Sequence, residues 1–239
     1  MTSTVLVAVA LSTSENTRAR KECCKKFQKL ADFAEVDCDL IQYQGRYSTG
    51  RNACPRELPL DEDIARWFSK IRYRPWAWVY GMLAAYGLRP HEAWFCEFVE
   101  GDYQQALQVT QGKTGPRLVY PLYPEWVQRW GLVKVSRPQV TVPIKDDGTR
   151  DYEEYGRRAC RQFTRYKVPF LPYDLRHAYG VRGSVKFGPA HGLTVPIMAA
   201  WMGHSPTVHL NLYNRWISGA QQQQQYQQFL DRTDGPSAP

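Results

Sequence analysis

The chain has 239 residues, of which 43% are hydrophobic and 23% are charged. This composition is typical of a globular protein and excludes a largely disordered chain. Lys and Arg number 31 against 23 Asp and Glu, so the net charge of +8 favours an anionic partner. No apolar run approaches the roughly 20 residues that span a bilayer. The apolar stretch Val5–Leu11 lacks the basic lead of a secretory signal.

The cysteines show neither a CxxC pair nor the dense spacing of a disulfide framework. Cytoplasmic proteins keep such thiols reduced. We therefore expect free thiols in a cytoplasmic protein at all six positions, which are Cys23, Cys24, Cys38, Cys54, Cys96 and Cys160.

The N-terminal segment predicts one amphipathic helix over residues 13–36. Ser12 and Glu15 stand at the spacing of a capping box. The apolar residues that follow recur at helical intervals, with basic residues between them: Cys23, Phe27, Leu30 and Ala34. A single helix does not make a domain, so this apolar stripe must dock on another element. Residues 43–58 then interrupt any regular pattern with Gly, Ser, Asn and Pro, which predicts a linker.

Beyond the linker, the pattern predicts an α+β fold that is mostly α-helical, with a small antiparallel β-sheet. Helices are expected over 59–71, 75–86, 150–166, 174–187, 194–203 and about 218–231. Short strands are expected over 95–99, 106–110 and 117–122, the last two joined by a hairpin-like connection. Residues 132–149 are expected to form a loop, and residues 234–239 a frayed end.

Three arginines, Arg157, Arg161 and Arg165, stand four residues apart on the helix predicted over 150–166. In a DNA-binding protein such a strip contacts phosphates and makes binding salt-dependent. In other proteins it is a solvated face. The sequence alone is compatible with both interpretations.

Five polar residues lie near the ends of the predicted elements: Arg89, Lys113, Arg176, His204 and Tyr213. Taken singly, each has an ordinary explanation, such as a solvated arginine, a lysine in a turn, a capping histidine or a packed tyrosine. Taken together, they form a cation-rich set without the carboxylate cluster that would hold Mg²⁺. Such a set is suited to an anionic phosphate whose transition-state charge is met by protein cations.

The order and spacing of these residues resemble the catalytic domain of the tyrosine recombinases, the phage integrase family, over about residues 57–218. The segment YGLRPHEAW resembles the box of the first catalytic arginine, here Arg89, with Glu92 as its supporting acid. The segment TQGKTGPRLVYPL resembles the β-hairpin that presents the catalytic lysine, here Lys113.

The other two boxes follow in the family's order. The segment YDLRHAYG resembles the second-arginine box, with Arg176 as the arginine and His177 as a structural support. The segment WMGHSPTVHLNLY resembles the last box, with His204 and the nucleophile Tyr213 at the usual separation. The resemblance therefore implies the tyrosine recombinase fold for a catalytic domain over 59–218, followed by a C-terminal helix and tail over 219–239.

Two features depart from the family pattern. Tyr173 stands where the second box usually has histidine. Its hydroxyl can donate a hydrogen bond to phosphate but cannot act as a near-neutral acid or base, so we expect a slower or differently tuned enzyme. The N-terminal part is short, and residues 1–42 correspond to a remnant of the core-binding domain, mainly one helix, with Val5–Leu11 as a trace of another.

The resemblance implies a site-specific DNA recombinase or integrase that cleaves and rejoins double-stranded DNA. Tyr213 would form a 3′-phosphotyrosyl link without ATP, a metal ion or another cofactor. Arg89 and Arg176 would bind the phosphate, and His204 would donate a hydrogen bond to it. Lys113 would protonate the leaving oxygen. The sequence does not decide what helps Tyr213 to lose its proton. Tyr173, His204 and the positive field of the surrounding cations are the three alternatives.

Two other functions stay open at this stage. A DNA-binding protein that has lost recombination would keep the same fold, and a topoisomerase-like relaxing enzyme would share the same chemistry. Covalent trapping distinguishes the first from a recombinase, and a two-site assay distinguishes the second. The resemblance also implies a homotetramer on DNA, no membrane or small-molecule partner, and a prokaryotic or phage origin.

Overall fold

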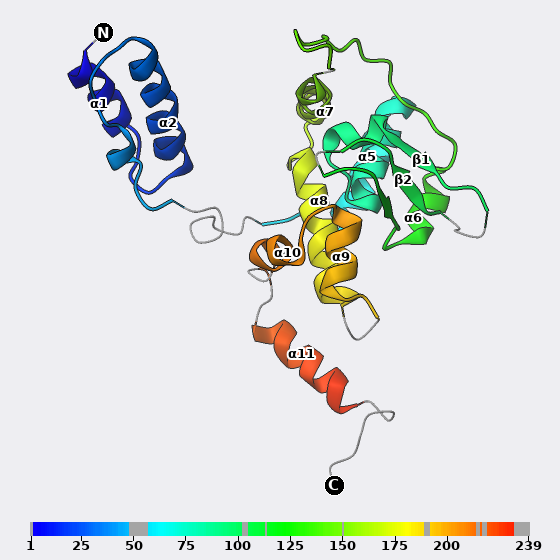
Figure 1. The fold of residues 1–239 in the computed structure, drawn as a ribbon. Coiled ribbons are helices and arrows are strands. Elements are labelled where there is room, and N and C mark those ends of the chain that lie inside the picture. The colour runs from blue at the N-terminus through cyan, green and yellow to red at the C-terminus, as the bar shows by residue number, and fades with distance from the viewer. Residues whose placement is uncertain are drawn as a thin grey trace. The chain divides into compact units, whose positions relative to one another are not determined.

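The computed structural model describes residues 2–47, 57–101, 105–112, 114–149, 151–188, 192–213, 216 and 219–231. The chain divides into two compact units, Met1–Arg56 and Glu57–Pro239 (Figure 1). Each unit is built around its own apolar cluster. Within the described residues, no helix is both long and apolar enough to span a membrane.

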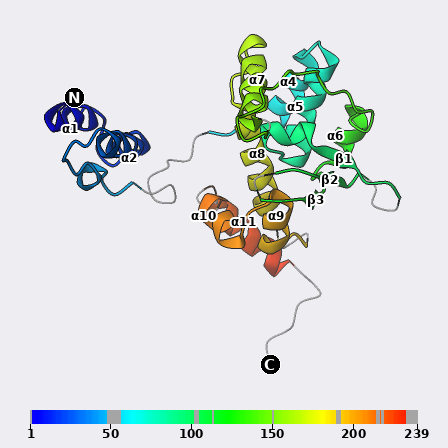
Figure 2. The same ribbon diagram turned by 45° about the horizontal axis from the view of Figure 1, so that its top comes forward.

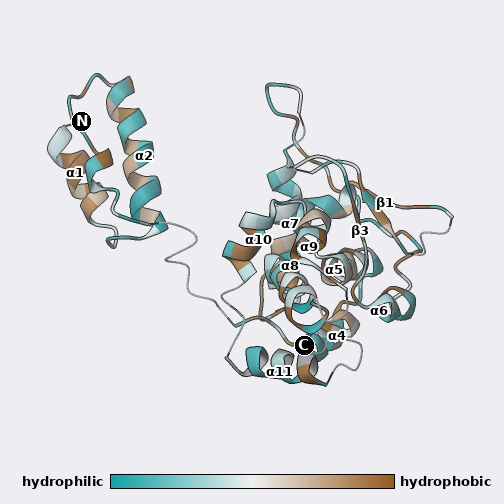
Figure 3. Cartoon of the chain, turned by 60° about the horizontal axis from the view of Figure 1, so that its bottom comes forward, coloured by the Kyte–Doolittle hydropathy of each residue, from teal (hydrophilic) through white to brown (hydrophobic). Residues whose placement is uncertain are grey.

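The first unit is a pair of helices rather than the single helix that the sequence predicted. Helix α1 spans Ser3–Leu11 and α2 spans Arg18–Phe33, followed by a short 3-10 helix, η1, over Ile41–Tyr43. Figure 3 shows α1 as largely apolar and α2 with hydrophilic residues along much of its length. The buried side chains of this unit come from all parts of it: Leu6, Ala10, Cys24, Ala31 and Leu40.

The break between α1 and α2 explains the difference from the prediction. Asn16 adopts a left-handed conformation, with φ of 57°, which a continuing helix does not tolerate. Thr17 then caps α2 by accepting a hydrogen bond from the Arg20 backbone N–H at 3.2 Å. The apolar stripe of α2 therefore docks on α1, which the sequence suggested only as a trace of a helix.

The second unit confirms the predicted α+β class. Its three strands form one antiparallel sheet in the order β1 (Cys96–Phe98), β2 (Leu107–Val109) and β3 (Arg117–Val119). Its α-helices are α4 (Asp61–Lys70), α5 (Arg74–Tyr86), α6 (Pro124–Arg129), α7 (Tyr152–Arg165), α8 (Pro172–Val181), α9 (Val195–Met202), α10 (Pro206–Tyr213) and α11 (Gly219–Leu230). A 3-10 helix, η2 (Pro90–Trp94), follows α5, and a π-helical turn, η3 (Arg182–Lys186), continues α8.

Helix α5 is the centre of this unit. Every residue from Ala77 to Tyr86 is buried, as expected of a helix that is apolar on all sides. Helix α5 packs on α8, and α9 packs on β3 and α10 (Figures 1 and 2). Gly87 ends α5 in the left-handed conformation, with φ of 60°. The segments that carry the four sequence boxes are therefore all attached to the same packed core.

The predicted helices and strands of this unit are present, with bounds shifted by a few residues. Helices α6 and α10 were not predicted, and residues 132–149 are mostly irregular, as expected. Parts of the predicted linker and of the C-terminal tail, residues 48–56 and 232–239, lie outside the described residues. The five cysteines that the structure describes are free thiols, as expected.

Candidate active site

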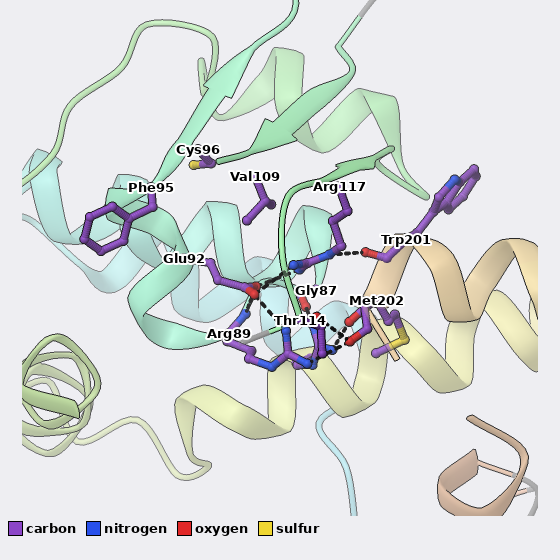
Figure 4. A network of polar contacts seen from close by, with 12 residues as sticks. Gly87, Arg89, Glu92, Phe95, Cys96, Val109, Thr114, Arg117, Trp201 and Met202 are labelled. Atoms are coloured by element: carbon purple, nitrogen blue, oxygen red, sulfur yellow. Dashed lines mark hydrogen bonds and ion pairs between the residues drawn. The ribbon is translucent and has the colours of Figure 1, made fainter. Parts of the chain in front are cut away.

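The first predicted arginine is fixed at the start of η2. The Glu92 carboxylate reaches back to Arg89, whose backbone N–H donates to Oε2 at 2.7 Å and whose Nη1 donates to Oε1 at 2.8 Å. Glu92 is fully buried. The carboxylate therefore holds both the backbone and the guanidinium of Arg89, as Figure 4 shows.

A third guanidinium, which was not singled out from the sequence, binds the same carboxylate. Arg117, at the start of β3, donates from Nη1 to Glu92 Oε1 at 2.8 Å and from Nη2 to Oε2 at 2.7 Å. Its Nε donates to the Trp201 carbonyl in α9 at 2.7 Å. Arg117 thus connects β3 to α9. It also binds the Glu92 carboxylate from the side opposite η2, the turn that carries Glu92 (Figure 4).

The second predicted arginine, Arg176 of α8, lies in the same place and is 3% exposed. Its Nη1 donates to the Gly87 carbonyl at 2.6 Å, and its Nη2 donates to the Met202 carbonyl. Arg89 Nη2 donates to the next carbonyl, that of Gly203, at 3.0 Å. The two guanidinium groups therefore meet at the C-terminal end of α9, where helix carbonyls need partners from outside the helix.

This arginine cluster, defined as Arg89, Arg117 and Arg176 around Glu92, carries more positive charge than its carboxylate balances. Three guanidinium charges and one carboxylate leave a net charge of +2. Burial alone would raise the pKa of Glu92, but the arginines outweigh it and lower the pKa to about 2. Burial, followed by the charge of Arg89, lowers the pKa of Arg176. A bound anion would offset this buried positive charge.

His204 follows directly after Gly203, at the edge of the arginine cluster. Burial, followed by the charge of Arg176, lowers its pKa to about 3, so the ring is neutral near neutral pH. Neither of its ring nitrogens has a hydrogen-bond partner within the described part of the chain. Because a neutral imidazole carries one N–H and one lone pair, His204 has a donor available beside the arginines.

The predicted nucleophile, Tyr213, ends α10 and is 2% exposed. Its ring lies against α8, because a Cβ placed on Gly180 would stand 2.5 Å from the Tyr213 ring atoms Cε1 and Cζ. The ring centroid is 4.6 Å from that of His209 and 6.0 Å from that of His204. The phenol also interacts electrostatically with Arg176. The structure thus brings Tyr213 to the arginine cluster.

Tyr173 and His177 lie at the edge of this group. Tyr173 is 41% exposed and packs edge-on against His177, with ring centroids 5.1 Å apart. The His177 ring in turn is 6.0 Å from that of Tyr213. His177 therefore has a tyrosine ring on either side, and its role as a structural support stays a prediction.

The predicted lysine lies outside the described residues, but its neighbours do not. Thr114 Oγ1 donates to the Gly203 carbonyl at 2.9 Å. A Cβ on Gly112 would stand 2.9 Å from Glu92 Oε1. The connection between β2 and β3 therefore lies against Glu92 through Gly112 and against the end of α9 through Thr114.

The strip of Arg157, Arg161 and Arg165 is exposed on α7 and is not part of the arginine cluster. Arg157 is paired with carboxylates at its own end of the helix, Asp151 at 2.6 Å and Glu154 at 2.8 Å. It is therefore less available to a DNA phosphate than the sequence suggested. A DNA contact by this strip stays a prediction.

No group of three or more His, Cys, Asp or Glu side chains within the described residues is placed to hold a metal ion. The arrangement that is present is instead a set of anion-binding donors around a buried phenol. Its chemical capacity is to hold a phosphate and to present an oxygen nucleophile to it.

Gly180 offers a test of the position of Tyr213. Gly180→Ala should push the Tyr213 ring away and slow any reaction of its hydroxyl by up to about 10²-fold. The overpacking should cost about 1–3 kcal/mol of unfolding free energy. The matched control is Gly156→Ala on α7, where the added Cβ would meet no atom within 4 Å. The control should gain about 0.5–1 kcal/mol, and equal behaviour of the two variants in denaturant melts would contradict the packing described.

Comparison with known proteins finds similar sequences across both units. A family model described as the XisA/XisC excisase second domain matches residues 1–44. Excisase A from Nostoc sp. is 31% identical over 229 residues, covering 84% of this chain and 46% of its own length. Excisase C from the same organism is 36% identical over 159 residues, covering 59% of this chain and 29% of its own length. The chain spans less than half the length of either relative.

Among solved structures, the Tn1549 transposon integrase in complex with circular intermediate DNA matches with a TM-score of 0.53 at 13% identity. The match covers 95% of this chain and 86% of that chain. This chain therefore has the tyrosine recombinase fold. The four boxes seen in the sequence lie at four places of this chain: the start of η2, the β2–β3 connection, α8, and the turn from α9 into α10.

Proposed function

We propose that the chain acts as a site-specific DNA recombinase that cleaves and rejoins DNA through a 3′-phosphotyrosyl intermediate. The observation that supports this most is that Arg89, Arg176 and His204, from three separate segments, meet at the end of α9, with Tyr213 beside Arg176 and His204. The net charge of +2 in the arginine cluster also fits a DNA phosphate. A phosphodiester carries one negative charge at rest, and a second develops as a nucleophile adds to phosphorus.

The arginines would bind the non-bridging oxygens of the phosphate. Arg89 and Arg176 each direct two nitrogens to protein acceptors, and a guanidinium has five N–H groups to give. Their planar forks match phosphate geometry. Neutral His204 would donate a further hydrogen bond. Removing one such donor typically costs about 10²–10³ in rate.

In the cleavage step, the Tyr213 oxygen forms a bond to phosphorus and the bond to the 5′ oxygen breaks. Tyr213 loses its proton, although its ordinary pKa is about 10, and the leaving oxygen gains one. A 5′ hydroxyl from another strand can then attack the phosphotyrosine and join exchanged partners, since the covalent link conserves the phosphodiester. We propose that protein groups alone carry this step, without ATP or a metal ion.

Lys113 is the proposed general acid for the leaving 5′ oxygen. Lys113→Ala should slow cleavage by about 10²–10⁴, the usual contribution of such a group. A substrate with sulfur in place of the 5′ bridging oxygen should restore the rate, because a thiolate leaves without a proton. Single-turnover cleavage of the two substrates measures this. If Lys113→Ala slows cleavage of the oxygen and the sulfur substrate equally, Lys113 is not the general acid.

The proposed partner is double-stranded DNA. The excess of basic residues favours it, and the Tn1549 integrase, which shares the fold, was solved in complex with circular intermediate DNA. The first unit offers exposed basic residues on α2, including Lys25 and Lys29, as a further DNA contact in addition to those of the second unit. A homotetramer on DNA completes the proposal, with the C-terminal helix as the element that joins subunits.

The experiment that tests the proposed function is covalent trapping on nicked candidate attachment-site DNA. The nick lets the short strand with the 5′ hydroxyl diffuse away, so the protein should remain joined to the 3′ phosphate in a denaturing gel. Failure to trap any adduct would favour a DNA-binding protein without strand exchange. Trapping without recombination of two sites would favour a relaxing enzyme.

A further inference from the structure

We propose that Nδ1 of His209 accepts the proton of the Tyr213 hydroxyl, and that Ser184 positions the ring for this role. The inference rests on the proposed function and names a group for its first step. His209 is the fourth residue of α10 and was given no role from the sequence. Three features of the structure support it: a fixed tautomer, an unused buried acceptor and direct ring contact with Tyr213.

Ser184 fixes the tautomer of His209. Ser184 Oγ donates its proton to the Gly180 carbonyl at 2.8 Å. The 2.8 Å contact between Ser184 Oγ and His209 Nε2 therefore uses a proton carried by the ring nitrogen. Because a neutral imidazole has one N–H, the other nitrogen, Nδ1, holds a lone pair.

This Nδ1 is an acceptor without a partner. His209 is 1% exposed, and within the described residues its Nδ1 makes no hydrogen bond. Leaving a buried polar atom unpaired is costly, so such atoms are rare and call for an explanation, of which a catalytic role is one. A proton that arrives during the reaction supplies that explanation here.

The ring beside His209 is that of the proposed nucleophile. The centroids of His209 and Tyr213 are 4.6 Å apart, closer than the 6.0 Å between Tyr213 and His204. The two residues are four positions apart on α10, so their side chains lie on one face. Two residues of α8 and its continuation η3 hold these side chains in place, because Gly180 contacts the Tyr213 ring and Ser184 binds His209.

The other two acceptors considered from the sequence are less suited to the role. Tyr173 is 41% exposed and its ring packs on His177 rather than on Tyr213. His204 stands beside the carbonyl that binds Arg89, where its N–H is needed by the phosphate. His209 is therefore the imidazole that is left to take the proton.

The charge state of His209 is compatible with accepting a proton. Burial, followed by the charge of Arg176, lowers its pKa to about 4, so the ring is neutral near neutral pH. A bound phosphate would offset the charge of Arg176 and make the ring more basic. Among the described residues, the titratable and charged groups that face it are Arg176 from α8, His204 after α9, and Tyr213 on its own helix.

The step balances with the groups already proposed. As the Tyr213 oxygen bonds to phosphorus, its O–H bond breaks and the proton passes to Nδ1, which leaves His209 as an imidazolium. The 5′ oxygen leaves with a proton from Lys113. In the rejoining step, the attacking 5′ hydroxyl returns its proton to Lys113 as its oxygen bonds to phosphorus, and the tyrosine oxygen leaves phosphorus and takes its proton back from His209.

The first measurement compares two asparagine variants. His209→Asn keeps an acceptor oxygen near the place of Nδ1 but takes up no proton, so single-turnover adduct formation should slow by about 10²–10⁴. DNA affinity should not change. His91→Asn is the matched control, a partly buried histidine outside the arginine cluster, and should react at the wild-type rate. A His209→Asn protein that reacts as fast as wild type overturns the inference.

The second measurement separates proton transfer from packing. A fluorinated tyrosine at position 213 has a more acidic hydroxyl and needs less help to lose its proton. It should restore most of the rate to His209→Asn while changing the rate of the His209 protein little. Equal slowing with both tyrosines would mean that His209 acts through packing and would overturn the inference. Absence of any adduct with the unaltered protein would instead overturn the proposed function.

Discussion

Replacing Tyr213 with phenylalanine should abolish the covalent protein–DNA adduct while leaving the fold and the DNA affinity nearly unchanged. The phenylalanine ring can keep the contact with Gly180, because ring carbons lie against that glycine. Without the hydroxyl, no oxygen is available to attack phosphorus, so the adduct should fall to background. A denaturing gel measures the adduct, and fluorescence anisotropy with labelled DNA measures the affinity.

The control for this substitution is the same change at an exposed tyrosine. Tyr73→Phe, on a residue that is 56% exposed, should form adduct at the wild-type rate. If Tyr213→Phe still forms adduct while its affinity is intact, another side chain is the nucleophile and the assignment of the last box is wrong.

Glu92→Gln should destabilise the protein by about 3–5 kcal/mol, the cost of breaking a buried ion pair by removing one partner. The Glu92 carboxylate accepts four hydrogen bonds, from the Arg89 backbone, Arg89 Nη1 and both terminal nitrogens of Arg117. The amide has one oxygen, and its NH₂ group would face guanidinium donors. Three guanidinium charges, of which that of Arg176 is buried and the other two are partly buried, would also lose their carboxylate. Chemical denaturation at pH 7 measures the loss.

The pH dependence of this effect follows from the pKa of Glu92. In the folded protein that pKa is about 2, below its ordinary value near 4.5. The ionised carboxylate therefore stabilises the fold above pH 4.5, and this contribution is lost as the pH falls through 2. The difference between wild type and Glu92→Gln should shrink over that range.

The matched control for Glu92→Gln is Glu125→Gln, an exposed glutamate in the first turn of α6. Its unfolding free energy should stay within about 0.5 kcal/mol of wild type. If Glu92→Gln is as stable as this control at pH 7, the carboxylate does not organise the arginines as described.

The parts of the fold that were predictable from the sequence are those governed by local rules. Gly87 marks the end of α5 because only glycine readily takes its left-handed conformation. The strands on either side of the hairpin follow from short apolar runs around a turn. By contrast, the break at Asn16 within the first unit depends on one residue in a left-handed conformation, which a helical apolar pattern does not reveal.

Helix α10 shows a different limit. Its sequence, PTVHLNLY, contains β-branched residues and no clear apolar stripe, so local propensity does not favour a helix. The helix is instead held by tertiary packing, since His209 and Tyr213 are the two side chains that it buries. The two residues that matter most for the proposed chemistry are thus the ones that fix the helix.

The arginines and the histidine of the site were singled out because their spacing resembles a known family. The structure brings Arg89 and Arg176 together at the end of α9, next to His204, and their catalytic roles stay predictions. Arg117 could not be found in this way. Its partners, Glu92 and the Trp201 carbonyl, stand 25 and 84 positions away in the sequence. Only the folded chain brings such distant groups together, and a basic residue after a turn is too common to single out.

The most direct test of the central claim is to identify the residue that becomes joined to DNA. Protein trapped on nicked site DNA would be digested, and the nucleotide-bearing peptide sequenced by mass spectrometry. The proposed mechanism predicts one peptide, containing Tyr213 esterified to a 3′ phosphate, together with a released strand that ends in a 5′ hydroxyl. Attachment at any other residue, or through a 5′ phosphate, would contradict it.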